Sequence, residues 1–197
     1  MINIEKDTQL LTTFFAEKKE VFMFEKGFYF LMLNWQYCLL LLFLITLLRT
    51  TTYKTKHKFN VWVANKHIKK LKNIEGIAQK FGFCRAINPY IFEEMVLTSF
   101  KKSGYKIKRS SRYSKDGGID GMIRMNGDWV FIQTKRYKSH IKKSHVSEFR
   151  QLCENKNVKG VFVHCGRTSK NTRKELGNSI EMVSGNRLIN LLVNHDF

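Results

Sequence analysis

The C-terminal half of this 197-residue sequence predicts an α/β fold, a mixed central sheet with flanking helices in the order αβββαβαβα, preceded by one transmembrane helix. Three observations support this prediction. An amphipathic helical pattern begins at Asn88-Pro89, an Asn126-Gly127 pair separates two strand-like runs, and later strand-like runs alternate with helical ones. A hairpin followed by strand–helix–strand units places antiparallel and parallel strands in one sheet.

Each element has a local signal. Asn88 and Ser144 are predicted helix caps, Gly104 ends the first helix, and the apolar run from Gly160 is typical of a strand buried on both faces. The predicted elements are a helix from Asn88 to Gly104, strands over 105–108, 119–125 and 129–137, a helix over 144–155, a strand over 160–165, a helix over 169–176, a strand over 180–183 and a helix over 186–193.

The composition is strongly basic, with a formal net charge of +19. The excess is uneven, because residues 49–84 hold nine basic residues and one acidic residue. Such a charge attracts polyanions, either nucleic acid or an anionic membrane face. None of the four cysteines forms a C-x-x-C pair, so neither a zinc site nor a disulfide framework is indicated. We expect no small-molecule cofactor.

Residues 28–48 form a run of 21 residues without a charge. At roughly 1.5 Å per residue, one helix of this length crosses a hydrocarbon core of about 30 Å. The run begins after 27 residues and no small-residue cleavage site follows it, which favours a retained anchor over a signal peptide. A buried core helix is the alternative. We therefore expect residues 28–48 to be a transmembrane helix.

The basic residues that follow this run predict its orientation. Lys and Arg concentrate on the cytoplasmic side of membrane spans, so residues 1–27 are the expected non-cytoplasmic tail. The protein is then expected in the inner, cytoplasmic membrane, with its C-terminal domain in the cytoplasm. Residues 49–87 are the expected basic juxtamembrane connector, which contacts anionic lipid headgroups, DNA or both.

Three polar residues on the predicted hairpin indicate phosphodiester chemistry. Asp120 lies in its first strand, and Gln133 and Lys135 lie two residues apart in the second, on one face, with Thr134 opposite. Hairpin pairing is expected to bring Asp120 near that pair. Asp120, the Gln133 side-chain oxygen and the Thr134 carbonyl are predicted Mg²⁺ ligands. Lys135 is predicted to position or deprotonate the attacking water, or to neutralise the phosphate.

Residues 89–190 resemble the catalytic domain of Mrr-type restriction endonucleases, in the PD-(D/E)XK nuclease superfamily. The matching segments are PYIFEEMVLTSFKKSGYKIKRS, DGGIDGMI, WVFIQTKRY, HVSEFRQLC and KGVFVHCG. In that family Gln replaces the usual acidic residue before x-K, as at Gln133, and the second aspartate of the DGGIDG segment, here Asp120, is a metal ligand. A helix acid also joins the site, which maps to Glu93, with Glu94 as the alternative.

The resemblance implies a restriction-endonuclease-like nuclease domain over residues 88–197. The implied activity is Mg²⁺-dependent hydrolysis of DNA by a membrane-anchored, type IV restriction-like enzyme, with Mn²⁺ as a substitute ion. Two other functions stay open: a non-catalytic DNA-binding membrane tether, and a related nuclease in repair, junction or plasmid processing. Double-strand cutting by this fold normally needs two active sites, which suggests a homodimer.

Basic residues after the second hairpin strand are the predicted DNA contacts, with a solvated loop as the alternative. His164 and Cys165 alternate on one strand, and we expect both in the core. The predicted DNA-binding residues are Arg136, Lys138, Lys142 and Lys143.

Overall fold

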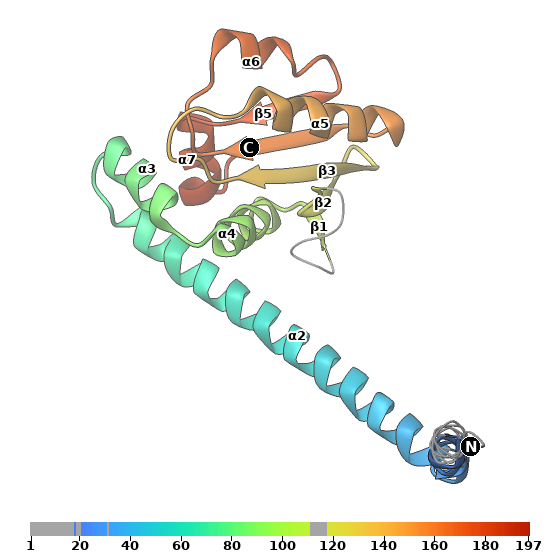
Figure 1. Ribbon diagram of the computed structural model, residues 1–197. Coiled ribbons are helices and arrows are strands. Elements are labelled where there is room, and N and C mark those ends of the chain that lie inside the picture. Colours follow the sequence, from blue (N-terminus) through green and yellow to red (C-terminus); the bar gives the residue numbers. More distant parts are fainter. Residues whose placement is uncertain (1–17, 19–20, 31, 111–117) are drawn as a thin grey trace, which may run out of the picture. The chain divides into compact units, whose positions relative to one another are not determined.

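The computed structural model describes residues 18, 21–30, 32–110 and 118–197, with residues 50–54 and 56 described by their backbone alone. The chain divides into two compact units, residues 1–55 and 56–197. Figure 1 labels the elements, which are α2 (Trp35–Lys72), α3 (Ile77–Ala86), α4 (Pro89–Lys102), β1 (Lys106–Arg109), β2 (Gly121–Met125), β3 (Asp128–Lys135), α5 (Lys143–Asn155), β4 (Gly160–His164), α6 (Lys170–Lys174), β5 (Ile180–Val183) and α7 (Asn186–Asn194).

A five-stranded mixed sheet in the order β1-β2-β3-β4-β5 organises the second unit. The strands β1, β2 and β3 pair antiparallel, whereas β3, β4 and β5 pair parallel. The helix α5 lies on one face of this sheet and α4 on the other (Figure 1). The predicted element order is confirmed, with bounds that differ by one or two residues.

Local sequence signals explain where several elements begin. The Asn88 side chain accepts a hydrogen bond from the backbone N–H of Tyr90 at 3.0 Å, which caps α4 as predicted. Asn126 and Gly127 both have positive φ, 49° and 94°, as the tight β2–β3 turn requires. The predicted cap at Ser144 is wrong, because α5 already begins at Lys143 and its N-cap residue, Lys142, makes no side-chain capping bond.

The sheet separates two hydrophobic clusters. Alternate residues of β3 contribute to different clusters: Ile132 packs on the face with α4 and α7, and Phe131 packs on the face with α5. Both faces of β3 and β4 are thus covered, which explains the nearly continuous apolar runs in these strands. His164 and Cys165 are fully buried, as expected.

The C-terminal part of α2 belongs to the core of the second unit. Ala64, Ile68 and Leu71, spaced by four and three residues, are buried on one side of the helix and join the cluster that contains α4. Cys84 of α3 joins the same cluster. Residues 56–87 therefore contribute to the fold of this unit, where the sequence indicated only a connector.

The described residues do not show the single transmembrane helix predicted over residues 28–48. No single described helix is long and apolar enough to cross a membrane, although Val21–Phe30 and Trp35–Arg49 meet that test together as a pair bent by 64°. The bend lies at Asn34, whose side-chain amide donates to the carbonyl of Phe30 at 2.7 Å and whose own carbonyl accepts from the first turn of α2. A short polar side chain that bonds to nearby backbone favours such a helix boundary. The predicted tail over residues 1–27 lies largely outside the described residues.

Candidate active site at the carboxyl end of β3

An irregularity in the β2–β3 hairpin sets the orientation of the Asp120 side chain. Gly121 pairs with Ile132 in the β2–β3 ladder, and the Asp120 N–H also donates to the Ile132 carbonyl, at 2.9 Å. Two residues of one strand therefore face one residue of the other, which is the pattern of a β-bulge and redirects a side chain. Asp120 Oδ2 consequently accepts bonds from Thr134, from its backbone N–H at 2.5 Å and from its Oγ1 at 2.7 Å.

Glu93, in the first turns of α4, shares this region with Asp120. The pKa of Glu93 is raised to about 8, mainly by burial and also by the neighbouring Asp120 carboxylate, while the Lys135 ammonium opposes the rise. Burial likewise raises the pKa of Asp120 to about 6, against the two Thr134 bonds and the Lys135 charge. The ionised forms of both carboxyl groups are therefore disfavoured unless a further cation binds beside them.

Gln133 carries a buried amide on the face of β3 opposite the Thr134 side chain. Its side chain is 6% exposed, and its Oε1 is buried without a hydrogen-bond partner in the part of the chain that the structure describes. A Cβ added at Gly118 would lie 2.4 Å from Gln133 Nε2, so this glycine makes room for the amide. Leaving a buried carbonyl oxygen unpaired costs about 1–3 kcal/mol, which suggests that a ligand supplies its partner.

Glu93 and Glu94 have different surroundings in the structure. Glu94 is 2% exposed, and its two oxygens meet Arg109 Nε at 2.8 Å and His57 Nδ1 at 3.1 Å. Arg109 Nη2 also donates to Thr98 Oγ1 at 3.2 Å. Glu94 is thus held by basic side chains between α2, α4 and β1, whereas Glu93 interacts electrostatically with Asp120 and Lys135.

The donor set fits a hard divalent cation. Two carboxylates with raised pKa values and an unpaired amide oxygen are the oxygen donors that Mg²⁺ prefers. Within the described ranges, no three His, Cys, Asp or Glu side chains gather as a metal cluster, so an amide or backbone oxygen must complete this set. Asp120, Glu93, Gln133 Oε1 and the Thr134 carbonyl are the candidate ligands.

The four predicted DNA-binding residues have different surroundings. Arg136 Nη1 donates to the carbonyl of Arg85 at 2.5 Å, near the C-terminus of α3, so this guanidinium is engaged within the protein. Lys143 pairs with Glu175 at 2.9 Å. Lys138 and Lys142 are exposed in the segment between β3 and α5. The two exposed lysines are therefore the better placed of the four to reach phosphate.

Several residues of this region were not singled out from the sequence. The Arg109 and His57 contacts with Glu94 join positions far apart in the chain, and no short motif signals them. The role of Thr134 in orienting Asp120 depends on the bulge. Tyr137 and His145 form a hydrogen-bonded pair next to this region, and only their place in a basic segment marked them.

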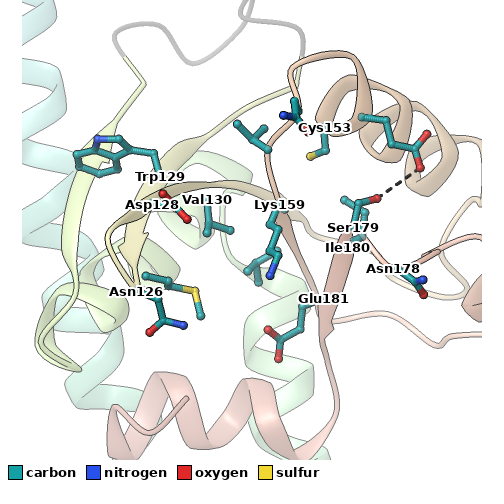
Figure 2. A pocket seen from close by; sticks show the side chains of 16 residues that line it. Asn126, Asp128, Trp129, Val130, Cys153, Lys159, Asn178, Ser179, Ile180 and Glu181 are labelled. Carbon is teal, nitrogen blue, oxygen red and sulfur yellow. Dashed lines mark hydrogen bonds between the residues drawn. The ribbon is translucent and has the colours of Figure 1, made fainter.

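A cavity of about 1010 Å³ lies at the opposite ends of the strands. It is bordered by the residues where β3, β4 and β5 begin, among them Asp128, Gly160 and Ile180 (Figure 2). The dashed line in Figure 2 is the hydrogen bond from Ser179 to Glu154, 3.4 Å long. None of the candidate site residues lines this cavity, so the catalytic assignment rests on the other end of the sheet.

Residues 84–192, more than half of the chain, match the family model of the Mrr catalytic domain, described as a restriction endonuclease. No curated protein and no solved structure gives a match. The matched range contains the five-stranded sheet, α4 and every candidate site residue. The mixed sheet with flanking helices fits a restriction-endonuclease-like fold. The chain therefore belongs to the Mrr-type restriction endonucleases of the PD-(D/E)XK superfamily.

Proposed function

We propose that this protein is a Mg²⁺-dependent DNA endonuclease of the type IV restriction class, with Mn²⁺ as a substitute ion. The observation that carries the proposal is the pairing of two partly buried carboxyl groups, Glu93 and Asp120, whose pKa values are raised to about 8 and about 6, with Lys135 beside them. A bound cation would stabilise the ionised forms of both carboxyl groups and offset their repulsion of DNA phosphate. The unpaired Gln133 oxygen supports the same cation site.

Each residue has a distinct role in this proposal. When bound, Mg²⁺ supplies Lewis-acid polarisation of the phosphoryl oxygen and lowers the pKa of a bound water. Asp120 is oriented by Thr134, and Glu93 and the Gln133 oxygen complete the protein's donors. Lys135 neutralises the phosphate and positions the attacking water from the strand end. Lys138 and Lys142 attract the flanking DNA backbone.

The test is cutting of supercoiled plasmid by the full-length protein in detergent, with Mg²⁺, with Mn²⁺ and with chelator. The full chain is needed because Ala64, Ile68 and Leu71 of α2 are part of the core. We expect metal-dependent nicking that is lost in Asp120→Ala and in Lys135→Ala. Linear product in addition to nicked circles would indicate paired active sites, as a homodimer provides.

A different result would favour one of the other functions. If wild-type protein cuts neither unmodified nor base-modified plasmid with either metal, yet binds DNA as well as both variants do, a non-catalytic tether is the better account. If it cuts branched junctions but leaves linear duplexes intact, a repair or junction nuclease is favoured.

We also propose that the N-terminal segment attaches the enzyme to the cytoplasmic membrane, with the nuclease domain in the cytoplasm. The support is the exposure of large apolar side chains in the described part of residues 21–48, such as Leu41 at 59% and Phe43 at 62%. The protein should sediment with membranes, resist high salt and be released by detergent. Release by salt alone would indicate an electrostatic contact between the basic segment and the membrane, and it would contradict an anchor.

A further inference from the structure

Tyr137 and His145 form a pair at the α5 side of the candidate site. Tyr137 follows the end of β3 by two residues, and His145 lies in the first turn of α5. The Tyr137 hydroxyl is hydrogen-bonded to His145 Nδ1, and the two rings stack with centroids 5.9 Å apart at an interplanar angle of 28°. The pair therefore fixes the imidazole plane and occupies one of its two nitrogens.

A row of rings supports this pair from the core. Tyr137 meets His164 edge-on with centroids 6.4 Å apart, and His164 meets Phe162 at 6.0 Å. His164 is itself fully buried and fixed, because its Nδ1 accepts from the Gly166 N–H at 3.2 Å and its Nε2 lies 3.1 Å from Thr168 Oγ1. His145 is thus mounted on rigid elements, as residues that position substrates usually are.

The location of the pair connects it with Lys135. Residues 131, 133 and 135 share the face of β3 that looks toward α5, and Tyr137 packs against the hydrophobic cluster of that face. Burial lowers the pKa of His145, as do the charges of Lys135 and Lys142, whereas Glu148 raises it. His145 therefore lies within electrostatic reach of Lys135 and stays neutral at neutral pH.

The second nitrogen of His145 faces no protein group. In the described part of the chain, His145 has Tyr137 as its hydrogen-bond partner and Nε2 has none. The side chain is only partly buried, so Nε2 is open to a ligand. Residues 135–147 contain no acidic residue, so the local charge favours an anion.

We propose that His145, held by Tyr137, donates a hydrogen bond from Nε2 to a non-bridging oxygen of a DNA phosphodiester next to Lys135. This inference rests on the proposed nuclease function and names a phosphate contact at that site. It assigns opposite sides of Lys135 to different tasks. The carboxylates beside α4 hold the cation, and the Tyr137–His145 pair beside α5 holds the DNA backbone.

Two substitutions at one position separate this role from a structural one. A glutamine amide nitrogen reaches the place of the imidazole Nε2, whereas an asparagine amide reaches only the place of Nδ1. If the phosphate contact matters, His145→Gln retains function and His145→Asn loses it. If only the bond to Tyr137 matters, the order is reversed.

The experiment measures plasmid cutting with Mg²⁺, and duplex affinity in chelator, for full-length wild type, both variants and Tyr137→Phe. We expect His145→Asn to weaken affinity and cutting together by about tenfold or more, the value of one hydrogen bond to a charged group. His145→Gln should stay within about threefold of wild type, and Tyr137→Phe should fall between. His67→Asn is the matched control, since lysines and burial also lower the pKa of His67 but it lies on α2 against Phe83.

Melting temperatures show whether each variant is folded. The proposal is overturned if His145→Asn binds and cuts at least as well as His145→Gln. The affinity measured in chelator keeps this test separate from the nuclease assignment. A wild type that binds DNA through His145 but never cuts contradicts the enzyme and leaves the phosphate contact intact.

Discussion

Two neighbouring glutamates of α4 belong to opposite kinds of environment. Glu94 is almost fully buried, and each of its oxygens contacts a basic side chain, Arg109 at 2.8 Å and His57 at 3.1 Å. Glu93 faces a second carboxyl group, Asp120, and shares Lys135 with it. The Glu94 region is balanced by the protein alone, whereas the Glu93 region is not.

The comparison shows how structural and functional charges are told apart. A buried carboxylate that the protein pairs completely joins elements of the fold, here α2, α4 and β1. Carboxyl groups whose pKa values stay raised are not fully compensated by charges of the protein. Such groups are typical of sites that bind a charged ligand. Each of the following substitutions tests one side of this contrast.

The largest effect is expected from Asp120→Asn. An asparagine oxygen can still accept the Thr134 bonds, but the negative charge for the cation is gone. The rate of plasmid cutting should fall by roughly 100- to 1000-fold, the usual loss for a key electrostatic group, while the melting temperature is retained. Cutting at the wild-type rate would remove Asp120 from the site.

Glu94→Gln should lower the free energy of unfolding and have little effect on the rate of DNA cutting. The substitution leaves the partly buried Arg109 without its anion, which costs about 3 kcal/mol, as is usual when one member of a buried pair is removed. Urea unfolding measures the loss. Protein that remains folded should cut at nearly the wild-type rate, and an unchanged unfolding midpoint would contradict the structural role.

Glu93→Gln should change stability with a defined pH dependence. A carboxyl group with a folded pKa of about 8 and an unfolded value near 4.5 stabilises the fold below the unfolded pKa, and this stability is lost as pH rises through 8. Wild type without metal should therefore lose stability relative to Glu93→Gln between pH 5 and 9, by up to roughly 4 kcal/mol. Parallel stability curves for the two proteins would show that Glu93 is not strained.

The smallest effect is expected from Gly118→Ala, compared with Gly127→Ala. Both glycines have φ near +94°, so alanine strains the backbone equally, by about 1 kcal/mol. Only at Gly118 does the new Cβ meet Gln133, at 2.4 Å. We expect similar melting temperatures, with slower cutting, by about tenfold, in Gly118→Ala alone. Equal cutting by both variants would exclude Gln133 from the site.

Much of the fold could be predicted from local patterns. The Asn88 cap, the Asn126-Gly127 turn and the apolar run of β4 each act within a few residues, so the sequence carries their signal directly. The family resemblance likewise pointed to Asp120, Gln133 and Lys135, and the structure brings Asp120 and Lys135 within electrostatic reach.

Other features depend on contacts between distant residues. Period-2 alternation treats a strand as regular, so it misses the bulge that turns Asp120 toward Thr134 and α4. The different roles of Glu93 and Glu94 depend on Arg109, which lies 15 residues from Glu94 along the chain. The pairing of β1 with β2 holds Arg109 near Glu94. The length of the charge-free run also gives no sign of the bend at Asn34, where the side-chain amide and the backbone N–H both donate to the carbonyl of Phe30.

The most direct test of the central claim is a calorimetric titration of Mn²⁺ into the full-length protein at pH 7, in two buffers of different ionisation enthalpy. Glu93, with a pKa of about 8, is mostly protonated at this pH, so cation binding should release a proton. The account predicts saturable binding with proton release in wild type, binding without that release in Glu93→Gln, and little binding in Asp120→Asn. No saturable binding in wild type, or the same binding in all three proteins, would contradict a metal site at these carboxylates.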